Sequence, residues 1–477
     1  MCPSKTSCER SAKSEIAPWV ARELAGVELG DKRLQRRAQI IMTQFSQQPT
    51  ASIPEACGQW GDIKAAYRFF NNDSVEPGHL LAAHSQATIR RMQSHPVILA
   101  VQDTTSLNYS THPQTEGLGP ISNNADKTLG LLVHSTLALA LSGEPLGLLD
   151  VQVRSRDRRH FGQSRNAHQR NKKSLAEKES QRWLDSLRAC QQAGRNCPQT
   201  TLVNVADREG DIYELFEQAL GGQGQGRVHL LVRAQHNRQV RQSTEQKLWP
   251  HLAAQPAAAT LMVRTPRQAG QAERTAHLTL RFGAVTLSAP TLKEQKPPLQ
   301  LWAVQAREEN PPAGRKAILW RLLTTLPLAN AAEAMEKVQW YCQRWQIEVL
   351  HKVLKSGCKI EQRQLETTMR LRRVLIMDLI VAWRILLLTK TARQNPEASA
   401  ADWLLEKEWK VLWVHMKKQP AKAPPTLHQA VRWIGQLGGF IGRKSDGEPG
   451  PIVLWRGLQR LHDLVHAWEI FNIVGNT

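Results

Sequence analysis

The succession of apolar segments between residues 97 and 233 constrains the fold more than any other feature of this sequence. Three strand-like segments come first: Val97–Val101, then GLLVHSTLALAL, and then GLLDVQVRS after a short SGEP turn. A helical pattern over Lys173–Gln192 follows, and TTLVNVADREGDIYELFEQAL then predicts a strand that stops at Asp207 before a second helix. RVHLLVRA supplies a further strand. Strands and helices in this order predict a mixed α/β sheet flanked by helices.

The order β, β, β, α, β, α, β is that of a ribonuclease-H-like sheet, in which the first and fourth strands lie side by side. Residues from about 235 to 312 interrupt it with short alternating strands, such as AHLTLRFGAVTLSAP, and we expect a β-rich insertion there. KAILWRLLTTLP resumes the strand pattern, and the chain is helical from Ala331 onward. We therefore predict a ribonuclease-H-like domain over residues 81–390, with helical domains at 1–80 and 391–477.

Charge and composition narrow the partners of the chain. The 477 residues carry 63 Lys and Arg against 42 Asp and Glu, a formal net charge of +21, and such an excess favours polyanionic partners. Charge alone does not separate nucleic acid from other anions. We find no apolar run long enough to span a bilayer and no secretion signal, so we expect a soluble, cytoplasmic protein without a membrane partner. The seven scattered cysteines contain no CxxC pair and favour neither disulfides nor a zinc site.

Two basic segments are candidates for contact with a polyanion. The segment LGDKRLQRRAQII predicts a helix with a basic side and an apolar side. The basic side consists of Lys32, Arg33, Arg36 and Arg37. The second segment, Arg154–Lys173, is a strongly basic loop. A solvated helix surface and a disordered loop are the plain alternatives, whereas a DNA partner would make both segments salt-dependent phosphate contacts.

Polar side chains form a single stripe on a helix predicted over Tyr341–Gly357. At about 100° of rotation per residue they fall within one narrow sector, and apolar residues cover the rest of the cylinder. The stripe consists of Tyr341, Arg344, Glu348, Lys352 and Lys355. A solvated face with spaced ion pairs has the same pattern, so the rest of the chain must decide whether the stripe belongs to a site.

Three carboxylates are candidates for one metal site. Asp103 follows the first predicted strand and Asp207 the fourth, so the two should come within reach of one ion, and Glu348 on the striped helix completes the group. Cleavage or transfer at a phosphodiester uses two hard cations, one for the attacking and one for the leaving oxygen. Mg²⁺ suits this role because it binds through a few carboxylates and keeps several waters.

Each carboxylate also has an ordinary explanation. An aspartate at a strand end is commonly a turn residue or a helix cap. Glu209 and Asp211 lie close enough in sequence to replace Asp207 as ligands. Glu348 could pair with Arg344 or Lys352. The strand order and the basic charge favour the metal site when all three are taken together.

Four ordered motifs resemble those of a known family. They are VQDTTSLNYS, GLGPISNNADKTLGLLVHSTLALA, VADREGDIYEL and the spacing of Tyr341, Arg344, Glu348 and Lys355. They resemble the bacterial cut-and-paste DDE transposases of the insertion sequence 4 family, whose YREK signature has the last spacing, and in particular the transposon five branch. The resemblance extends from about Trp19 to the segment LGGFIGRKSDGEPG.

The resemblance implies a ribonuclease-H-like core with a β-rich insertion, an N-terminal domain that reads transposon ends and a C-terminal helical region that dimerises. Asp103, Asp207 and Glu348 would hold Mg²⁺ or Mn²⁺ in a two-metal site. The polar residues of the stripe would hold a DNA phosphate, and Trp320 would stack on an extruded base.

The reaction implied by the resemblance has four steps at one site. Water attacks a phosphodiester at a transposon end and frees a 3′ hydroxyl, which forms a hairpin with the opposite strand. The hairpin is reopened, and the 3′ hydroxyl then attacks target DNA. The partners would be double-stranded DNA, as end repeats and as target, and a second copy of the chain in a synaptic complex.

Other functions share some of these features. A DNA-binding regulator on a transposase scaffold is disfavoured by the complete triad and the basic N-terminal helices. A structure-selective nuclease would use the same chemistry without strand transfer. The YREK residues favour strand transfer and so argue against this alternative. A glycoside hydrolase with two carboxylates fits poorly with the charge and the basic loop.

Overall fold

A computed structural model of the chain describes residues 15–122, 127–160, 179–222, 226, 228–241, 247–265, 273–290, 295–443 and 446–474. The described residues form two compact units. One takes its residues from Met1–Ala83 and Thr391–Thr477, and the other is His84–Lys390. The division into three domains, at 1–80, 81–390 and 391–477, stays a prediction.

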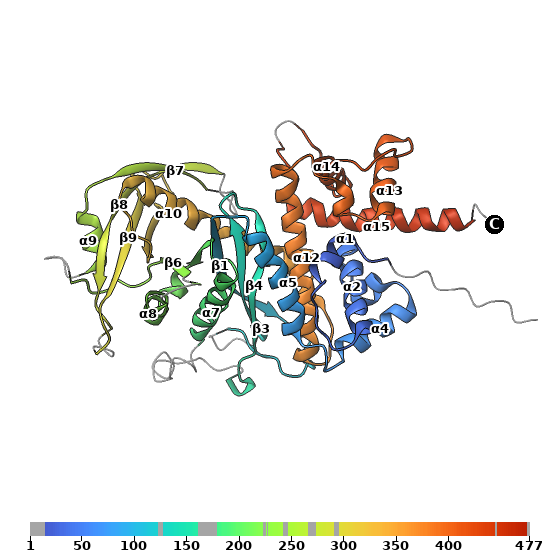
Figure 1. Ribbon diagram of the computed structural model, residues 1–477, viewed down its shortest axis with the longest axis horizontal. Helices are drawn as coiled ribbons and strands as arrows, with labels where there is room; N and C mark the ends of the chain where they lie inside the picture. The colour runs from blue at the N-terminus through green and yellow to red at the C-terminus, as the bar shows by residue number, and fades with distance from the viewer. Residues whose placement is uncertain are drawn as a thin grey trace, which may run out of the picture. The chain divides into compact units, whose positions relative to one another are not determined.

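The second unit is built on one mixed sheet. Its strands are β1 Val97–Asn108, β2 Gly119–Pro120, β3 Leu129–Ala140, β4 Pro145–Arg154, β5 Thr201–Ala206, β6 Val228–Arg233, β7 Ala259–Thr265, β8 Arg274–Leu287, β9 Leu299–Glu308 and β10 Leu319–Thr324. They lie in the order β2-β3-β1-β5-β6-β10-β9-β8-β7, with β4 beside β3 (Figure 1). β1 is antiparallel to β3 and parallel to β5, and β6 is parallel to β5. The predicted neighbours β1 and β5 are therefore confirmed, and the sheet is consistent with a ribonuclease-H-like core.

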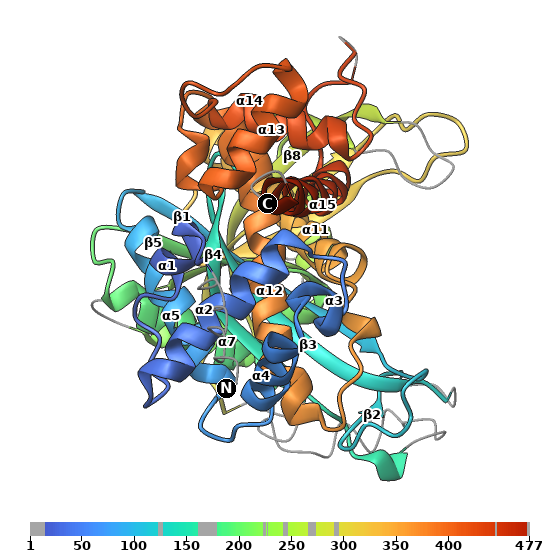
Figure 2. The same ribbon diagram turned by 90° about the vertical axis from the view of Figure 1, so that its right-hand side faces the viewer.

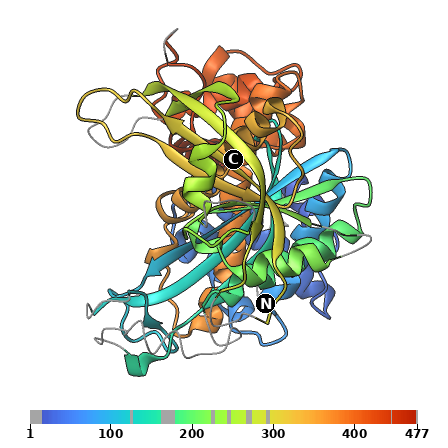
Figure 3. The ribbon, with the colours of Figure 1, turned by 90° about the vertical axis from the view of Figure 1, so that its left-hand side faces the viewer.

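The predicted β-rich insertion continues this sheet. β10 is antiparallel to both β6 and β9, and β9, β8 and β7 follow as antiparallel neighbours. Figure 3 shows the long yellow strands of this part from the side. The insertion also contains the short helix α9, Leu248–Ala254. Because β10 lies between the core and the insertion, residues at its start can line a site shared by both.

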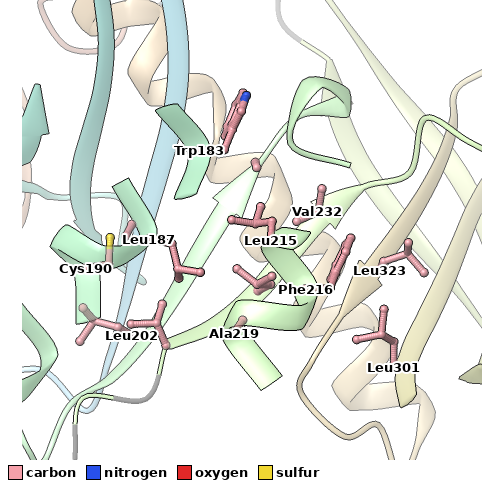
Figure 4. Close-up of a cluster of buried hydrophobic side chains, with 14 of the residues drawn as sticks. Trp183, Leu187, Cys190, Leu202, Leu215, Phe216, Ala219, Val232, Leu301 and Leu323 are labelled. Carbon is pink, nitrogen blue, oxygen red and sulfur yellow. The ribbon is translucent and has the colours of Figure 1, made fainter. Parts of the chain in front are cut away.

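The helices α7, Gln181–Arg195, and α8, Tyr213–Gly221, cover one face of this sheet. Apolar side chains from both helices, such as Leu187 and Phe216, lie near strand residues such as Leu202 and Leu323 in one buried cluster (Figure 4). Burial of this apolar surface is the main favourable contribution to folding, and it fixes the strands that carry the polar residues described below.

Three further helices carry the striped segment and the residues after it. They are α10 Ala331–Gln343, α11 Trp345–Lys352 and α12 Thr368–Gln394. α12 runs across the boundary between the two units, as does α5, Pro77–Met92. Of the helices in the described ranges, none combines the length and the hydropathy that crossing a membrane requires.

The first unit is helical, as predicted for both ends of the chain. Its helices are α1 Pro18–Glu23, α2 Lys32–Gln47, α3 Ile53–Cys57, α4 Trp60–Phe70, α13 Glu406–Lys417, α14 Leu427–Leu437 and α15 Pro451–Val474 (Figure 2). Gln47 of α2 donates a hydrogen bond of 3.0 Å to Glu408 of α13. Contacts of this kind join the N-terminal and C-terminal segments into one unit.

Candidate functional site

Asp103 and Asp207 stand side by side on neighbouring strands. The last residues paired in the parallel register of β1 and β5 are Val101 and Val205, and each aspartate lies two residues further along its strand. Asp207 directly follows β5. The prediction that Asp103 ends its strand is wrong, because β3 continues to pair with β1 as far as Asn108, beyond the end of β5. The polar segment after Val101 hides this continuation in the sequence.

The carboxylate of Asp207 accepts a hydrogen bond of 2.8 Å from the backbone N–H of Glu209, at the start of a short 3-10 helix. The two rival ligands are engaged elsewhere. Glu209 pairs with Arg182 at 2.5 Å. Asp211 is buried, pairs with Arg238 at 2.7 Å and accepts hydrogen bonds from two backbone N–H groups. Of the three acidic residues in this loop, Asp207 is therefore the one that forms no ion pair with another described residue. It remains the candidate ligand beside Asp103.

The striped helix is not one regular α-helix, contrary to the prediction. Arg344 separates α10 from α11, and residues Val353–Gly357 form a π-helical turn in which the N–H of Cys358 bonds to the carbonyl of Val353 at 2.9 Å. Apolar spacing does not reveal such a change of hydrogen bonding, because all of these turns bury similar side chains. The position of Lys355 therefore does not follow from 100° per residue.

Arg344 connects Glu348 to Asp103. Its guanidinium contacts the carboxylate of Glu348, and its Nη1 lies 4.0 Å from Oδ2 of Asp103. Arg344 is only 14% exposed, so this contact is poorly screened by water. Two members of the stripe, Arg344 and Glu348, thus lie close to Asp103 of β1.

The carboxylates influence one another electrostatically. The pKa of Asp103 is raised to about 7, mainly by burial; the positive charge of Arg344 opposes this rise, and the negative charges of Asp207 and Glu348 add to it. His351 on α11 is a neighbour of Asp103, and its Nδ1 lies 3.9 Å from Oδ2 of that aspartate. Burial lowers the pKa of His351 to about 3, so it is neutral at physiological pH.

Carboxylate oxygens are the donors that Mg²⁺ and Mn²⁺ prefer, and the level positions of Asp103 and Asp207 suit a shared ion. In the part of the chain that the structure describes, however, no three His, Cys, Asp or Glu side chains meet in a group that could hold a metal ion. Glu348 is in contact with Arg344 instead. The carboxylate donors fit a divalent ion. Glu348, however, must release Arg344 before it can bind that ion.

Trp320 and Tyr341 lie next to this group. Their rings meet edge to face, with centroids 5.7 Å apart. Burial raises the pKa of Tyr341, whereas the positive charges of Arg344 and Arg233 lower it, and Arg233 also hydrogen-bonds the tyrosine side chain. Trp320, whose sequence position is equally typical of a core residue, is only half-buried.

A pocket of about 580 Å³ opens beside Trp320. Two tryptophans and four cationic side chains line it, and no acidic side chain does. The six tryptophan and cationic residues are Arg208, Arg233, Trp249, Lys316, Trp320 and Arg321. Sequence reasoning found only Trp320 among them. Arg208, directly after Asp207, and Arg233, near the end of RVHLLVRA, were available signals, since each lies at the end of a predicted strand.

The two lysines of the stripe differ in their surroundings. Lys355 is half-buried, and its positive charge lowers the pKa of the neighbouring His351, so it lies near the carboxylate group. Lys352 is exposed, and it forms no ion pair with the carboxylates in the described ranges. Of Arg344 and Lys352, the two ion-pair partners considered for Glu348, Arg344 is the one in contact with it.

The basic side of α2 is only partly free. Arg33 pairs with Asp31 at 2.8 Å, and Arg37 pairs with Asp62 at 2.7 Å. Lys32 and Arg36 are exposed and form no ion pair with other described residues. The sequence pattern treats the four charges alike, because it does not show which of them an acidic neighbour balances.

The described part of the basic loop is also balanced by acidic side chains. Arg154 pairs with Asp185 at 2.8 Å, Arg156 with Glu179 at 2.6 Å, and Arg159 with Asp157 at 2.6 Å. Residues 161–173 of the loop lie outside the described residues. The expectation that this part contacts phosphate therefore stays a prediction.

Three family models match the chain in consecutive order. They are described as Transposase DNA-binding over residues 16–75, Transposase DDE domain over residues 154–384 and Transposase Tn5 dimerisation domain over residues 380–470. Asp207 and Glu348 lie within the DDE match, and Asp103 precedes it.

One similar solved structure is a cryo-EM structure of the piggyBac transposase synaptic complex with hairpin DNA. It has 9% sequence identity and a TM-score of 0.36, and the match covers 80% of this chain and 73% of that one. At this TM-score the similarity carries no argument.

Proposed function

We propose that this chain, a DDE transposase by its three consecutive family matches, cuts DNA at the ends of a mobile element and joins the freed 3′ ends to target DNA. One observation supports this proposal most directly. Asp103 and Asp207 are level on two parallel strands, and Glu348 is near enough to raise the pKa of Asp103. This proximity supports a common site for the three carboxylates.

DDE domains generally use divalent metal ions, and here Asp103, Asp207 and Glu348 would hold Mg²⁺ or Mn²⁺ as a pair of ions. Such ions, when bound, activate the attacking oxygen and stabilise the leaving oxygen of a phosphodiester. Because Arg344 contacts Glu348, its guanidinium must turn away before that carboxylate becomes a ligand. A DNA phosphate is the natural acceptor for the released guanidinium, since arginine binds phosphate through two parallel hydrogen bonds.

The remaining residues of the site would position the DNA strand. Tyr341 offers a hydroxyl and Lys355 a point charge to the phosphate that Arg344 engages. Trp320 would stack on a base extruded from the duplex, which lets the free 3′ hydroxyl reach the opposite strand and form a hairpin. The same residues would serve hairpin opening and the attack on target DNA.

Recognition of the transposon ends would belong to the first unit, in which the DNA-binding match covers α2 with its exposed Lys32 and Arg36. The dimerisation match covers α13, α14 and most of α15. A homodimer would therefore bring two ends together in a synaptic complex.

One observation favours a second candidate, a DNA-binding regulator on the same scaffold. No three metal-binding side chains meet among the described residues, as would hold for a chain that binds ends without cutting them. Cleavage of a DNA fragment that carries the flanking repeats of this gene, with Mg²⁺ or with chelator, separates the two functions.

The matched variants for this experiment are Glu348→Gln and Glu366→Gln. The first removes a proposed ligand and keeps its size, and the second removes an acidic side chain from an exposed surface pair with Arg370. A transposase gives Mg²⁺-dependent double-strand release with hairpin ends in the native chain and in Glu366→Gln, and none in Glu348→Gln. Binding by all three proteins without any cut would identify the regulator.

A further inference from the structure

We propose that Arg321, held over the ring of Trp249, is a nucleotide-binding residue that binds the phosphate of an unpaired nucleotide in the pocket beside Trp320. The proposal rests on the proposed function, because it assigns the extruded nucleotide of that reaction to a defined pocket. It goes beyond that function by adding a second recognition element, contributed by the insertion and by β10.

The chemistry of the pocket selects its ligand. A volume of about 580 Å³ lies within the usual range of about 300–1,000 Å³ for pockets that enclose a small organic ligand. The indole ring of Trp320 provides a stacking surface, and four cationic side chains with no acidic one among the lining residues favour an anion. A nucleotide combines a stacking base with an anionic phosphate, and it satisfies both demands.

Two contacts fix the guanidinium of Arg321. Its Cζ lies 4.4 Å from the centroid of the Trp249 ring, and its Nε donates a hydrogen bond of 3.1 Å to Oε1 of Gln305. Trp249 in turn packs against the buried hydrophobic cluster of the sheet. An arginine held in this way loses little further conformational freedom when it binds a ligand, and this is the preorganisation that a binding site requires.

The charge of Arg321 lacks a partner. It forms no ion pair with any described residue, and neither Nη nitrogen has a hydrogen-bond partner there. Burial and the nearby positive charge of Arg307 lower the pKa of Arg321, which means that the folded chain disfavours its charged form. A partly buried cation that is destabilised in this way is compensated when an anion binds to it.

The pocket begins at the candidate site. Arg208 directly follows Asp207, Arg233 hydrogen-bonds the side chain of Tyr341, and the ring of Trp320 meets that of Tyr341. A nucleotide that leaves the duplex next to the phosphodiester held at the carboxylates would therefore enter this pocket. Its base would stack on Trp320, and its phosphate would lie against the free Nη groups of Arg321. Since a phosphate is the same for every base, this grip is independent of sequence.

The test measures binding of a fluorescent single-stranded oligonucleotide to the full-length protein, together with the fluorescence of 2-aminopurine placed near the cut site in a duplex end repeat. The variants are Arg321→Met, Arg321→Lys and Trp249→Leu. The matched control is Arg264→Met, which removes an exposed arginine of the insertion that pairs with Glu273 outside the pocket.

We expect Arg321→Met to weaken oligonucleotide binding about tenfold, the factor that one lost charge-assisted contact produces, equally for all base compositions. Arg321→Lys should recover part of this loss. Trp249→Leu should give an intermediate loss, because the guanidinium stays but is no longer held. The 2-aminopurine signal should fall in the same order, and Arg264→Met should match the native chain in both measurements.

Equal oligonucleotide affinity of Arg321→Met and the native chain would overturn the pocket proposal, whether or not the protein cuts DNA. A loss that Arg264→Met shares would also overturn it, because the effect would then come from net charge alone. Absence of cleavage in the native chain, with the Arg321 effect intact, would instead reject the transposase reaction and keep the pocket. Thermal unfolding of each variant verifies that the chain folds.

Discussion

Arg344 lies between two of the three proposed metal ligands, in contact with the carboxylate of Glu348 and 4.0 Å from that of Asp103. The guanidinium neutralises part of the negative charge that the site collects. In the chain without DNA, this arrangement stabilises carboxylates that would otherwise repel one another. The same arrangement makes Arg344 a competitor of the divalent ion.

Replacement of Arg344 should separate ion binding from cleavage. In Arg344→Ala, Glu348 is released, so Mn²⁺ should bind the DNA-free chain about two- to fivefold more tightly, as expected for the loss of a partly exposed ion pair. DNA cleavage should nevertheless slow, because the phosphate loses its bidentate partner. Electron paramagnetic resonance of free Mn²⁺ measures the first effect. Lys352→Ala, which removes an exposed charge at the end of α11, serves as the control and should leave Mn²⁺ binding unchanged.

Asp103 should make folding stability depend on pH. Its pKa rises from an ordinary value of 3.8 to about 7 in the folded chain, so between these values the folded state binds more protons than the unfolded state. Stability contributed by this group is therefore present at low pH, and it is lost as pH rises toward about 7. In the presence of chelator, Asp103→Asn should raise the free energy of unfolding at pH 8 by about 1–2 kcal/mol.

Thermal unfolding at pH 5 and pH 8 checks this prediction. The stabilisation of Asp103→Asn relative to the native chain should shrink at pH 5, where the native carboxyl is already protonated. The variant should also fail to cut DNA. A destabilised Asp103→Asn at both pH values would contradict the burial of a charge at this position.

The sequence predicts the neighbouring strands and the residues of the stripe because both follow from local periodicity. The order of strands and helices allows few topologies, and Asp103 and Asp207 come together as soon as β1 and β5 pair. Local patterns do not show which residues far along the chain will pair with a given strand or side chain. The extension of β1 beyond Asp103 depends on β3, and the pairing of Arg37 depends on Asp62 of another helix.

The cationic pocket illustrates the same limit. Trp249 and Arg321 are 72 residues apart, and neither belongs to a recognisable motif. They meet because β10 pairs with β9 while α9 packs on the adjacent strands, and both are tertiary features. Among the six lining residues, the family resemblance assigns a role only to Trp320, although Arg208 lies within the motif VADREGDIYEL.

A buried ion pair between Arg363 and Asp378 should be needed for folding. Arg363 and Asp378 form two hydrogen bonds of 2.9 Å and are 3% and 1% exposed. Asp378→Ala leaves a buried guanidinium without its carboxylate, so the free energy of unfolding should fall by about 3–5 kcal/mol. Chemical denaturation measures the loss. Glu366→Ala removes a partner of Arg370 from an exposed pair and should cost at most about 1 kcal/mol. Equal losses in the two variants would mean that burial does not govern these pairs.

The four basic residues of α2 should contribute unequally to DNA binding. Lys32 and Arg36 are exposed and have no ion pair among the described residues, whereas Asp31 and Asp62 balance Arg33 and Arg37. Each free cation that neutralises a phosphate adds about 0.9 to the slope of log K against log salt concentration. The double variant Lys32→Ala, Arg36→Ala should therefore reduce this slope by about 1.8 and weaken binding of the end repeat at low salt.

The double variant Arg33→Ala, Arg37→Ala is the matched comparison, since it removes the same number of charges from the same helix. Its slope should change by less than half as much, because those charges are already compensated in the free chain. Titration of a labelled end repeat at four salt concentrations gives both slopes. If the two double variants lose the same slope, the ion pairs with Asp31 and Asp62 open on DNA and all four residues contact phosphate, as the sequence pattern alone would suggest.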